Sequence, residues 1–333
     1  MNITQKPALL VVRCEDLWFS DGSMVLQADN TQYKVFHSIL SLRSPIFRDM
    51  LSIPQGADLE RVEGCPLVRL PDAERDVTPF LKAIYTPLSF PSYPNDVDVQ
   101  TLLGCFALSH KYEVEDLRRR ALAHIAQGID LQPPEFTPKG CKWSEEADWM
   151  HIVRFARVAR TTGDLWVLPW VFLCLSRGLD RELRVDELLQ GVGEQGEVLP
   201  LSELPTLLGG RDLLKNADLE AAMAAFSTAP GRIDGCTGYV CLEMRLTLLK
   251  KLSESVREEE LSSWVTVRAA LTILREDQAL GDELCARCCK VLLDAQEARL
   301  TKMWQDVPGF FGLPDWPELD AMREQAVGPN IYC

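Results

Sequence analysis

The stretch from residue 21 to residue 51 constrains the fold most, because its patterning changes from strand-like to helix-like within one short segment. Two strand-like runs separated by a polar turn occupy residues 25–36. From His37 onward, the apolar residues recur at helical spacing. Ser44 then stands as a good N-cap before Pro45, which suits the first helical position. The stretch predicts a β-hairpin followed by two short helices.

The residues that follow continue this mixture of strand and helix. Residues 67–70 have the composition of a third strand. Thr78 and Pro79 form a second pair of N-cap and proline, which predicts that a helix begins there. Two amphipathic helices are predicted over residues 99–107 and 114–125. We therefore expect a small sheet flanked by helices.

A proline-rich segment divides the chain into two predicted domains. The fold class that we predict is an α+β domain over residues 15–128, a linker over 129–146 and a mainly α-helical domain over 147–320. The predicted helices of the second domain span residues 147–161, 165–177, 202–209, 218–227, 239–256, 261–275 and 282–306. The aromatic segment at 304–316 is expected to pack against its own domain.

Charge and cysteine content exclude several classes of partner. The formal net charge is −14 and the isoelectric point is near 4.9, which argues against nucleic-acid and membrane partners, because phosphate surfaces are bound through Lys and Arg. The most apolar run, residues 165–175, is too short to cross a bilayer and is predicted to be a buried helix. The first residues lack the apolar core of a signal peptide, and the 11 cysteines are then expected to be reduced. These features predict a location in the cytoplasm or nucleus.

Residues 191–196 match the G-x-G-x-x-G pattern of dinucleotide-binding turns. The context of the pattern differs from that of a nucleotide site, because no strand leads into it and no helix follows to hold a pyrophosphate. Glu194 and Glu197 would also repel that anion. We interpret the match as an ordinary loop and predict no cofactor.

Two pairs of cysteines form a candidate metal site. Cys236 and Cys241 have four residues between them, and Cys285 and Cys288 have two, so four thiolates could close a tetrahedral zinc site. The 43 residues from 242 to 284 separate the pairs, however, and cysteines three or four positions apart in a helix also form a buried stripe. The sequence therefore favours packed thiols without a metal, with structural zinc as the alternative.

Catalytic patterns are absent from the sequence. It contains no G-x-S-x-G, H-E-x-x-H or Walker A motif, and its four histidines all precede residue 152. The many carboxylates are not distinguished by spacing. We predict that the protein is not an enzyme.

Five residues match the pattern of one family. Asp21 precedes the predicted hairpin, His37 follows it, Ser44 and Phe47 match the spacing S-x-x-F, and Tyr85 ends the next helix. Together with the third strand and the closing pair of helices, they resemble a BTB (POZ) domain, in the form found in uncharacterised basidiomycete fungal proteins. The later cysteines and the aromatic segment also resemble the C-terminal half of those proteins, for which no activity is established.

The resemblance implies a domain that dimerises and binds protein partners, which in one branch of the family is the cullin scaffold of ubiquitin ligases. Two features depart from specialised branches. Ser38 stands where transcription-factor members often carry Lys or Arg, and no substrate-binding repeat is visible downstream.

We therefore expect a non-enzymatic interaction protein, an adaptor or scaffold, whose partner is a second copy, another protein or a cullin. The alternatives are a substrate adaptor of a cullin-based ubiquitin ligase and a zinc-stabilised helical domain of unknown activity. We expect mostly structural roles for the matching residues, with Phe47 in the core, Ser44 as a helix cap, and Asp21 and His37 in local hydrogen bonds.

Overall fold

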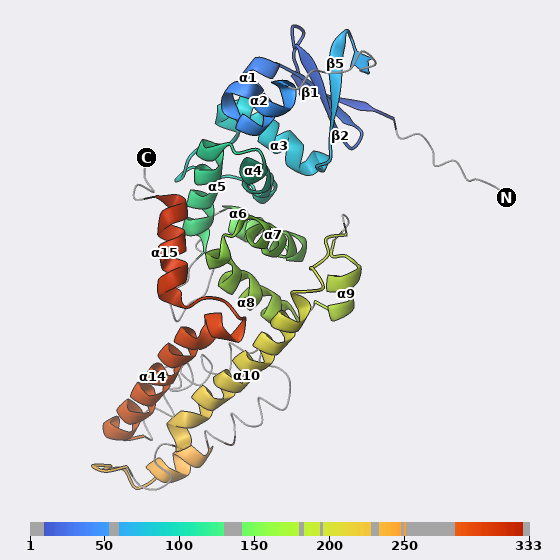
Figure 1. Cartoon of the computed structure of the whole chain (residues 1–333). Helices are drawn as coiled ribbons and strands as arrows, with labels where there is room; N and C mark the ends of the chain where they lie inside the picture. Colours follow the sequence, from blue (N-terminus) through green and yellow to red (C-terminus); the bar gives the residue numbers. More distant parts are fainter. Residues whose placement is uncertain are drawn as a thin grey trace, which may run out of the picture. The chain divides into compact units, whose positions relative to one another are not determined.

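The computed structural model describes residues 10–52, 60–129, 142–179, 183–193, 196–227, 233–247, 250 and 284–328 (Figure 1). These residues form two compact units. The first unit contains the described residues up to 129, residues 142–147 and the end of the chain from Glu324, and the second contains the described residues between 148 and 323. The expected order, a small sheet with helices followed by a helical part, is confirmed at this coarse level.

The sheet of the first unit has five strands in the order β1-β3-β2-β5-β4. The strands are β1 (Val12–Trp18), β2 (Met24–Ala28), β3 (Thr31–Val35), β4 (Arg61–Val62) and β5 (Cys65–Leu70). The predicted hairpin is formed by β2 and β3, which pair antiparallel around a turn in which Asp29 has a φ of 47°. The strands β5 and β1 pair in parallel with β2 and β3, respectively.

Two short helices of the first unit lie between β3 and β4 along the chain, and the other helices follow β5. In chain order, the helices are α1 (His37–Arg43), α2 (Pro45–Ser52), α3 (Glu74–Tyr85), the 3-10 turn η1 (Pro87–Ser89), α4 (Val99–Lys111), α5 (Glu115–Gly128) and α6 (Lys142–Glu146). The two short helices predicted after the hairpin are thus α1 and α2, with Pro45 at the first position of α2.

The beginning of α3 differs from the prediction. Thr78 and Pro79 lie inside the helix, which begins at Glu74, where the backbone N–H donates to Asp29 Oδ2 at 2.7 Å. A proline at this position leaves the carbonyl of Arg75 without its usual helical donor. The side-chain amide of Gln100 from α4 donates to that carbonyl at 2.6 Å instead. This tertiary hydrogen bond allows the helix to continue through the proline.

The predicted linker contains a helix that packs onto the first unit. Trp143 of α6 is buried, and its indole N–H donates to the carbonyl of His124 at 3.3 Å. A Cβ atom at Gly128 would lie 2.2 Å from the Trp143 ring, so glycine is required for this approach. Residues 142–147 therefore belong to the first unit, although their proline-rich approach suggests a linker.

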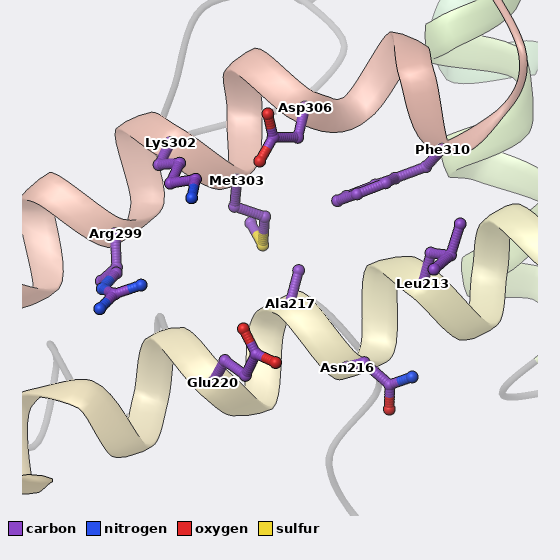
Figure 2. A pocket seen from close by; sticks show the side chains of 9 residues that line it. All are labelled: Leu213, Asn216, Ala217, Glu220, Arg299, Lys302, Met303, Asp306 and Phe310. Atoms are coloured by element: carbon purple, nitrogen blue, oxygen red, sulfur yellow. The ribbon is translucent and has the colours of Figure 1, made fainter.

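The second unit is helical in its described part, apart from one isolated β-bridge. Its helices are α7 (Trp149–Thr162), the 3-10 turn η2 (Leu165–Val167), α8 (Leu168–Leu179), α9 (Val185–Gln190), α10 (Leu204–Ser227), α14 (Ala286–Phe310) and the part of α15 (Trp316–Val327) that precedes Glu324. The two helices predicted at 202–209 and 218–227 form the single helix α10, which lies alongside α14 (Figures 1 and 2). Residues 241–247 are also helical, whereas the helix predicted at 261–275 falls outside the described residues.

Aromatic side chains hold the end of the chain in place. Trp304 and Trp316 stack with ring centroids 4.3 Å apart, and Phe311 stacks on Phe172 of α8 at 5.1 Å. The expectation that this segment packs against its own domain is confirmed. The apolar run at 165–175 is buried within η2 and α8, as predicted. Among the described helices, none has the length and apolar character that crossing a bilayer would need.

Candidate metal centre

Four cysteines from two distant segments meet in the second unit. Cys236 lies in the loop before the helical segment 241–247, and Cys241 is the first residue of that segment. Cys285 is the N-cap of α14, and Cys288 lies in the first turn of that helix. In the part of the chain that the structure describes, this is the one group of three or more histidine, cysteine or acidic side chains close enough to share a metal ion.

The distances between the four sulfur atoms suit one metal ion. All four Sγ atoms lie within 4.8 Å of one another, and those of Cys236 and Cys285 are 3.9 Å apart. A tetrahedral zinc ion with Zn–S bonds of about 2.3 Å places its ligand sulfurs about 3.8 Å apart. A disulfide would need a separation of about 2.0 Å, and the described cysteines are all free thiols. The geometry therefore fits mononuclear coordination better than oxidation.

Apolar side chains surround part of the centre, and a hollow of about 160 Å³ lined by Cys236, Cys241, Cys288 and Arg245 lies beside it. Cys241 and Cys288 are buried with Ile233, Leu284 and Leu292 in one small core. The neighbouring thiol of Cys289 packs against that core and is not part of the ligand group.

Gly238 allows the two segments to come together. A Cβ atom at Gly238 would lie 2.4 Å from Cys241 Sγ and 3.6 Å from Cys285 Cβ. Real Cβ atoms do not approach a sulfur atom this closely, so any larger residue would displace the Cys241 thiol. The Cys241 sulfur atom thus occupies the space that a side chain at position 238 would need.

Backbone N–H groups prepare part of the centre for metal binding. The pKa of Cys285 is lowered to about 5, because the backbone N–H groups of Cys288 and Thr237 favour its thiolate. The pKa of Cys236 is lowered because Cys288 donates a hydrogen bond to it, whereas burial raises the pKa of Cys288 itself. Metal binding needs all four thiolates, so an ion would displace the remaining protons.

Because the four cysteines meet, structural zinc gains support relative to packed thiols without a metal, which the sequence favours. The four thiols do pack in a core, as expected, but they also form a cluster that could hold a metal ion. The 43 residues between the two cysteine pairs do not argue against a metal site, because the segment 241–247 and the start of α14 lie together. The helical spacing of Cys285 and Cys288 is also a weak argument against a metal site, because Cys285 precedes α14 as its N-cap.

The five residues that match the BTB pattern lie in the first unit, and four of them have local partners. Ser44 is fully buried, its Oγ donates to the Tyr112 carbonyl, and it accepts from the backbone N–H of Phe47 at 3.1 Å, as an N-cap does. Phe47 is in the core and stacks on Tyr112 with ring centroids 4.4 Å apart. These two residues occupy the positions that a structural role requires.

The other three matching residues do not form a site with them. The ring of His37 shares a hydrogen bond of 2.9 Å with Ser23 Oγ, and Tyr85 donates to the Phe36 carbonyl at 2.7 Å. Asp21 is exposed in the turn before β2. The local hydrogen bond predicted for Asp21 is not found among the described residues. The histidines predicted to be structural also have local partners, such as the Pro91 carbonyl at 2.9 Å from the ring of His124.

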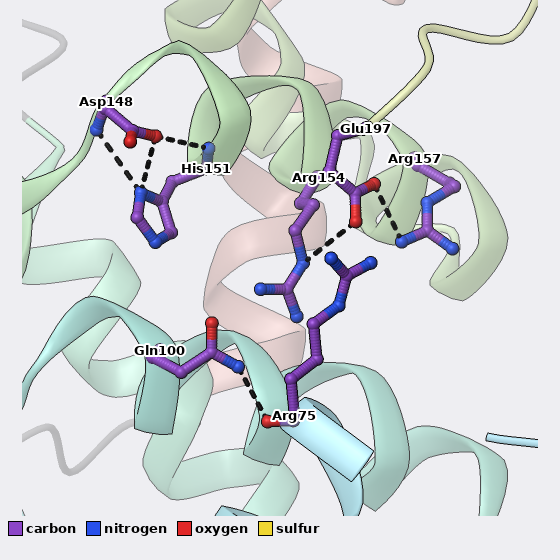
Figure 3. Close-up of polar contacts among 7 residues, drawn as sticks. All are labelled: Arg75, Gln100, Asp148, His151, Arg154, Arg157 and Glu197. Carbon is purple, nitrogen blue, oxygen red and sulfur yellow. Dashed lines mark hydrogen bonds and ion pairs between the residues drawn. The ribbon is translucent and has the colours of Figure 1, made fainter. Parts of the chain in front are cut away.

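The described residues of the glycine-rich stretch 191–196 lie beside an isolated antiparallel β-bridge between Val192 and Glu197. Val192 and Glu197 exchange backbone hydrogen bonds of 2.7 and 3.0 Å, and Gly191, Gly193 and Gly196 all have positive φ. Glu197 is buried, and its carboxylate lies 3.2 Å from Arg157 Nη2 and 3.8 Å from Arg154 Nε (Figure 3). The sequence next to these glycines thus provides the carboxylate of a buried ion pair.

Comparison with protein-family models, with curated proteins and with solved structures finds no match for this chain.

Proposed function

We propose that this chain is a non-enzymatic protein-interaction protein with a BTB/POZ-like N-terminal unit, whose helical second unit is stabilised by one structural zinc ion. In this proposal the N-terminal unit contacts the partner. The zinc ion, bound by Cys236, Cys241, Cys285 and Cys288, holds two distant segments of the second unit together.

A group of exposed apolar side chains on α1 and α2 carries the interaction part of the proposal. Leu42 is 83% exposed, and Ile39 and Ile46 on either side of it are each 36% exposed. Single exposed leucines are ordinary, but three large aliphatic residues within eight positions of sequence are typical of an interaction surface. The hairpin, the two short helices and the parallel strand β5 give the order of elements that the BTB resemblance implies.

Self-association tests this surface directly. We expect the purified full chain to have the mass of a dimer in size-exclusion chromatography with light scattering. Leu42→Asp is expected to shift the mass to that of a monomer, because it places a charge in the apolar contact. Leu88→Asp is the matched control, because Leu88 is 89% exposed in η1 of the same unit. A dimer that Leu42→Asp leaves intact would contradict the role of this surface.

If the wild-type chain is a monomer, the proposed surface on α1 and α2 would have to bind a different protein. Affinity capture with the wild-type, Leu42→Asp and Leu88→Asp proteins would then identify a partner lost only in the first variant. A cullin among the lost partners would support the adaptor alternative. If no protein is lost, the proposed interaction surface is wrong.

Zinc in the second unit is supported by the four sulfur atoms within 4.8 Å of one another. An S₄ set of this size suits zinc, which accepts tetrahedral thiolate ligands and needs no redox change. We expect elemental analysis of the purified protein to find one zinc ion per chain. Protein that neither retains nor takes up zinc, with all four thiols reduced, would remove this part of the proposal.

A further inference from the structure

A hollow of about 220 Å³ opens between α10 and α14, far from the cysteines along the helices (Figure 2). Its apolar part is made by Met303, which is buried, and by Leu213 and Phe310 at one end. In Figure 2 the Phe310 ring extends across the gap between the helices, and the Met303 sulfur points into it. The hollow therefore has an apolar floor and one apolar end.

The rim of the hollow carries charges of both signs. Arg299, Lys302 and Asp306 point from α14 toward α10, and Glu220 points from α10 toward α14 (Figure 2). In the described part of the chain, none of these four side chains forms an ion pair or a side-chain hydrogen bond with another residue. Arg299 and Glu220, which are exposed on the two facing helices, lie on opposite sides of the hollow.

We propose that this hollow binds a small zwitterionic molecule with an apolar side chain, of the class of the apolar α-amino acids. The carboxylate lies at Arg299 and Lys302, and the ammonium lies at Glu220 and Asp306. The apolar side chain extends over Met303 toward Phe310.

Charge and size both favour this class of ligand. A simple anion would meet two carboxylates, and a simple cation would meet two basic groups, so only a ligand with both charges satisfies the whole rim. Pockets for drug-sized ligands have volumes of roughly 300–1,000 Å³. The present hollow is smaller, which limits the ligand to a few functional groups.

Calorimetric titration of the full chain with L-phenylalanine tests the proposal. We expect saturable binding at one site per chain. Glu220→Gln and Arg299→Gln should each weaken binding by about tenfold or more, since each removes one charged contact. Lys290→Gln is the matched control, because Lys290 is exposed on the same helix and does not line the hollow. It should leave binding unchanged.

Two analogues separate the charges of the ligand. The compound 3-phenylpropionate lacks the ammonium group and phenethylamine lacks the carboxylate, so each should bind about tenfold more weakly than L-phenylalanine. Glu220→Gln should weaken phenethylamine and leave 3-phenylpropionate unaffected or improved. The proposal is overturned by the absence of saturable binding up to about 10 mM L-phenylalanine. It is equally overturned by analogues that bind as tightly as L-phenylalanine, or by binding that the two rim variants do not weaken.

Discussion

Replacing Cys241 by serine is the sharpest perturbation of the proposed zinc centre. The thiol is 1% exposed, and its Sγ accepts the backbone N–H of Cys285 at 3.3 Å, so it lies where the two segments meet. Serine keeps the approximate shape of the side chain but is a poor zinc ligand. The variant should therefore lose the cross-link and keep most of the packing.

The magnitude follows from the length of chain that the metal closes. Cys241 and Cys285 are 44 positions apart, so the closed loop contains 45 residues. Treated like a disulfide, this closure removes about 13 cal/mol/K of entropy from the unfolded chain, or about 4 kcal/mol at 25 °C. For a unit of this size, a change of 1 kcal/mol shifts the melting temperature by about 2–4 °C. Zinc should therefore raise the melting temperature of the second unit by about 8–16 °C.

Calorimetry on zinc-loaded and chelator-treated protein measures this difference within each variant, so that packing effects of the substitution cancel. The wild-type protein and Cys289→Ser should show the full metal-dependent shift, because Cys289 packs beside the centre without being one of its ligands. Cys241→Ser should show little or none. The reasoning is refuted if Cys241→Ser and Cys289→Ser show equal shifts, or if chelation leaves the wild-type melting temperature unchanged.

Three further predictions concern the cysteine centre and the buried ion pair of Glu197. Gly238→Ala should weaken zinc retention against a competing chelator by tenfold or more, because the added Cβ would meet Cys241 Sγ; equal retention would contradict the close approach. The folded-state pKa of Cys285 is lowered to about 5. The side chain is therefore mostly thiolate above about pH 5 and becomes protonated only below it. Metal-free protein should therefore be alkylated by iodoacetamide first at Cys285 at pH 6.5, as mass spectrometry can show; faster alkylation at Cys288, whose pKa is raised, would be inconsistent with this. Glu197→Gln should destabilise the second unit by about 3 kcal/mol in urea unfolding, because it breaks a buried ion pair. Asp186→Asn, which breaks an exposed pair, should leave the unfolding midpoint nearly unchanged.

The sequence predicts the first unit well wherever local signals decide the structure. The hairpin, the cap at Ser44 and the short helices all depend on turn chemistry and on periodicity over a few residues. The beginning of α3 was mispredicted because its continuation through Pro79 depends on Gln100, a residue from another helix. The packing of Trp143 was missed because the contact with Gly128 is tertiary.

The candidate centre could be predicted only in part. Cysteine spacing identifies the four residues, but no local pattern reports whether segments 44 positions apart in sequence meet. The one further signal was Gly238, whose place between Cys236 and Cys241 suits a backbone that must approach a sulfur atom closely. The sequence also does not predict that Leu42 is exposed, because an apolar residue in a helix is ordinarily assigned to the core.

The separation between the two cysteine pairs has a consequence for the order of events during synthesis. At about 5–20 residues per second, the ribosome adds the 44 positions between Cys241 and Cys285 in about 2–9 seconds. During this interval the nascent chain contains only two of the four cysteines of the centre, while the sheet and the helices up to residue 129 are already available to fold. If the proposed zinc ion binds, its loading is therefore a late step, and the exposed face of α1 and α2 exists on the nascent polypeptide before the second unit can be completed.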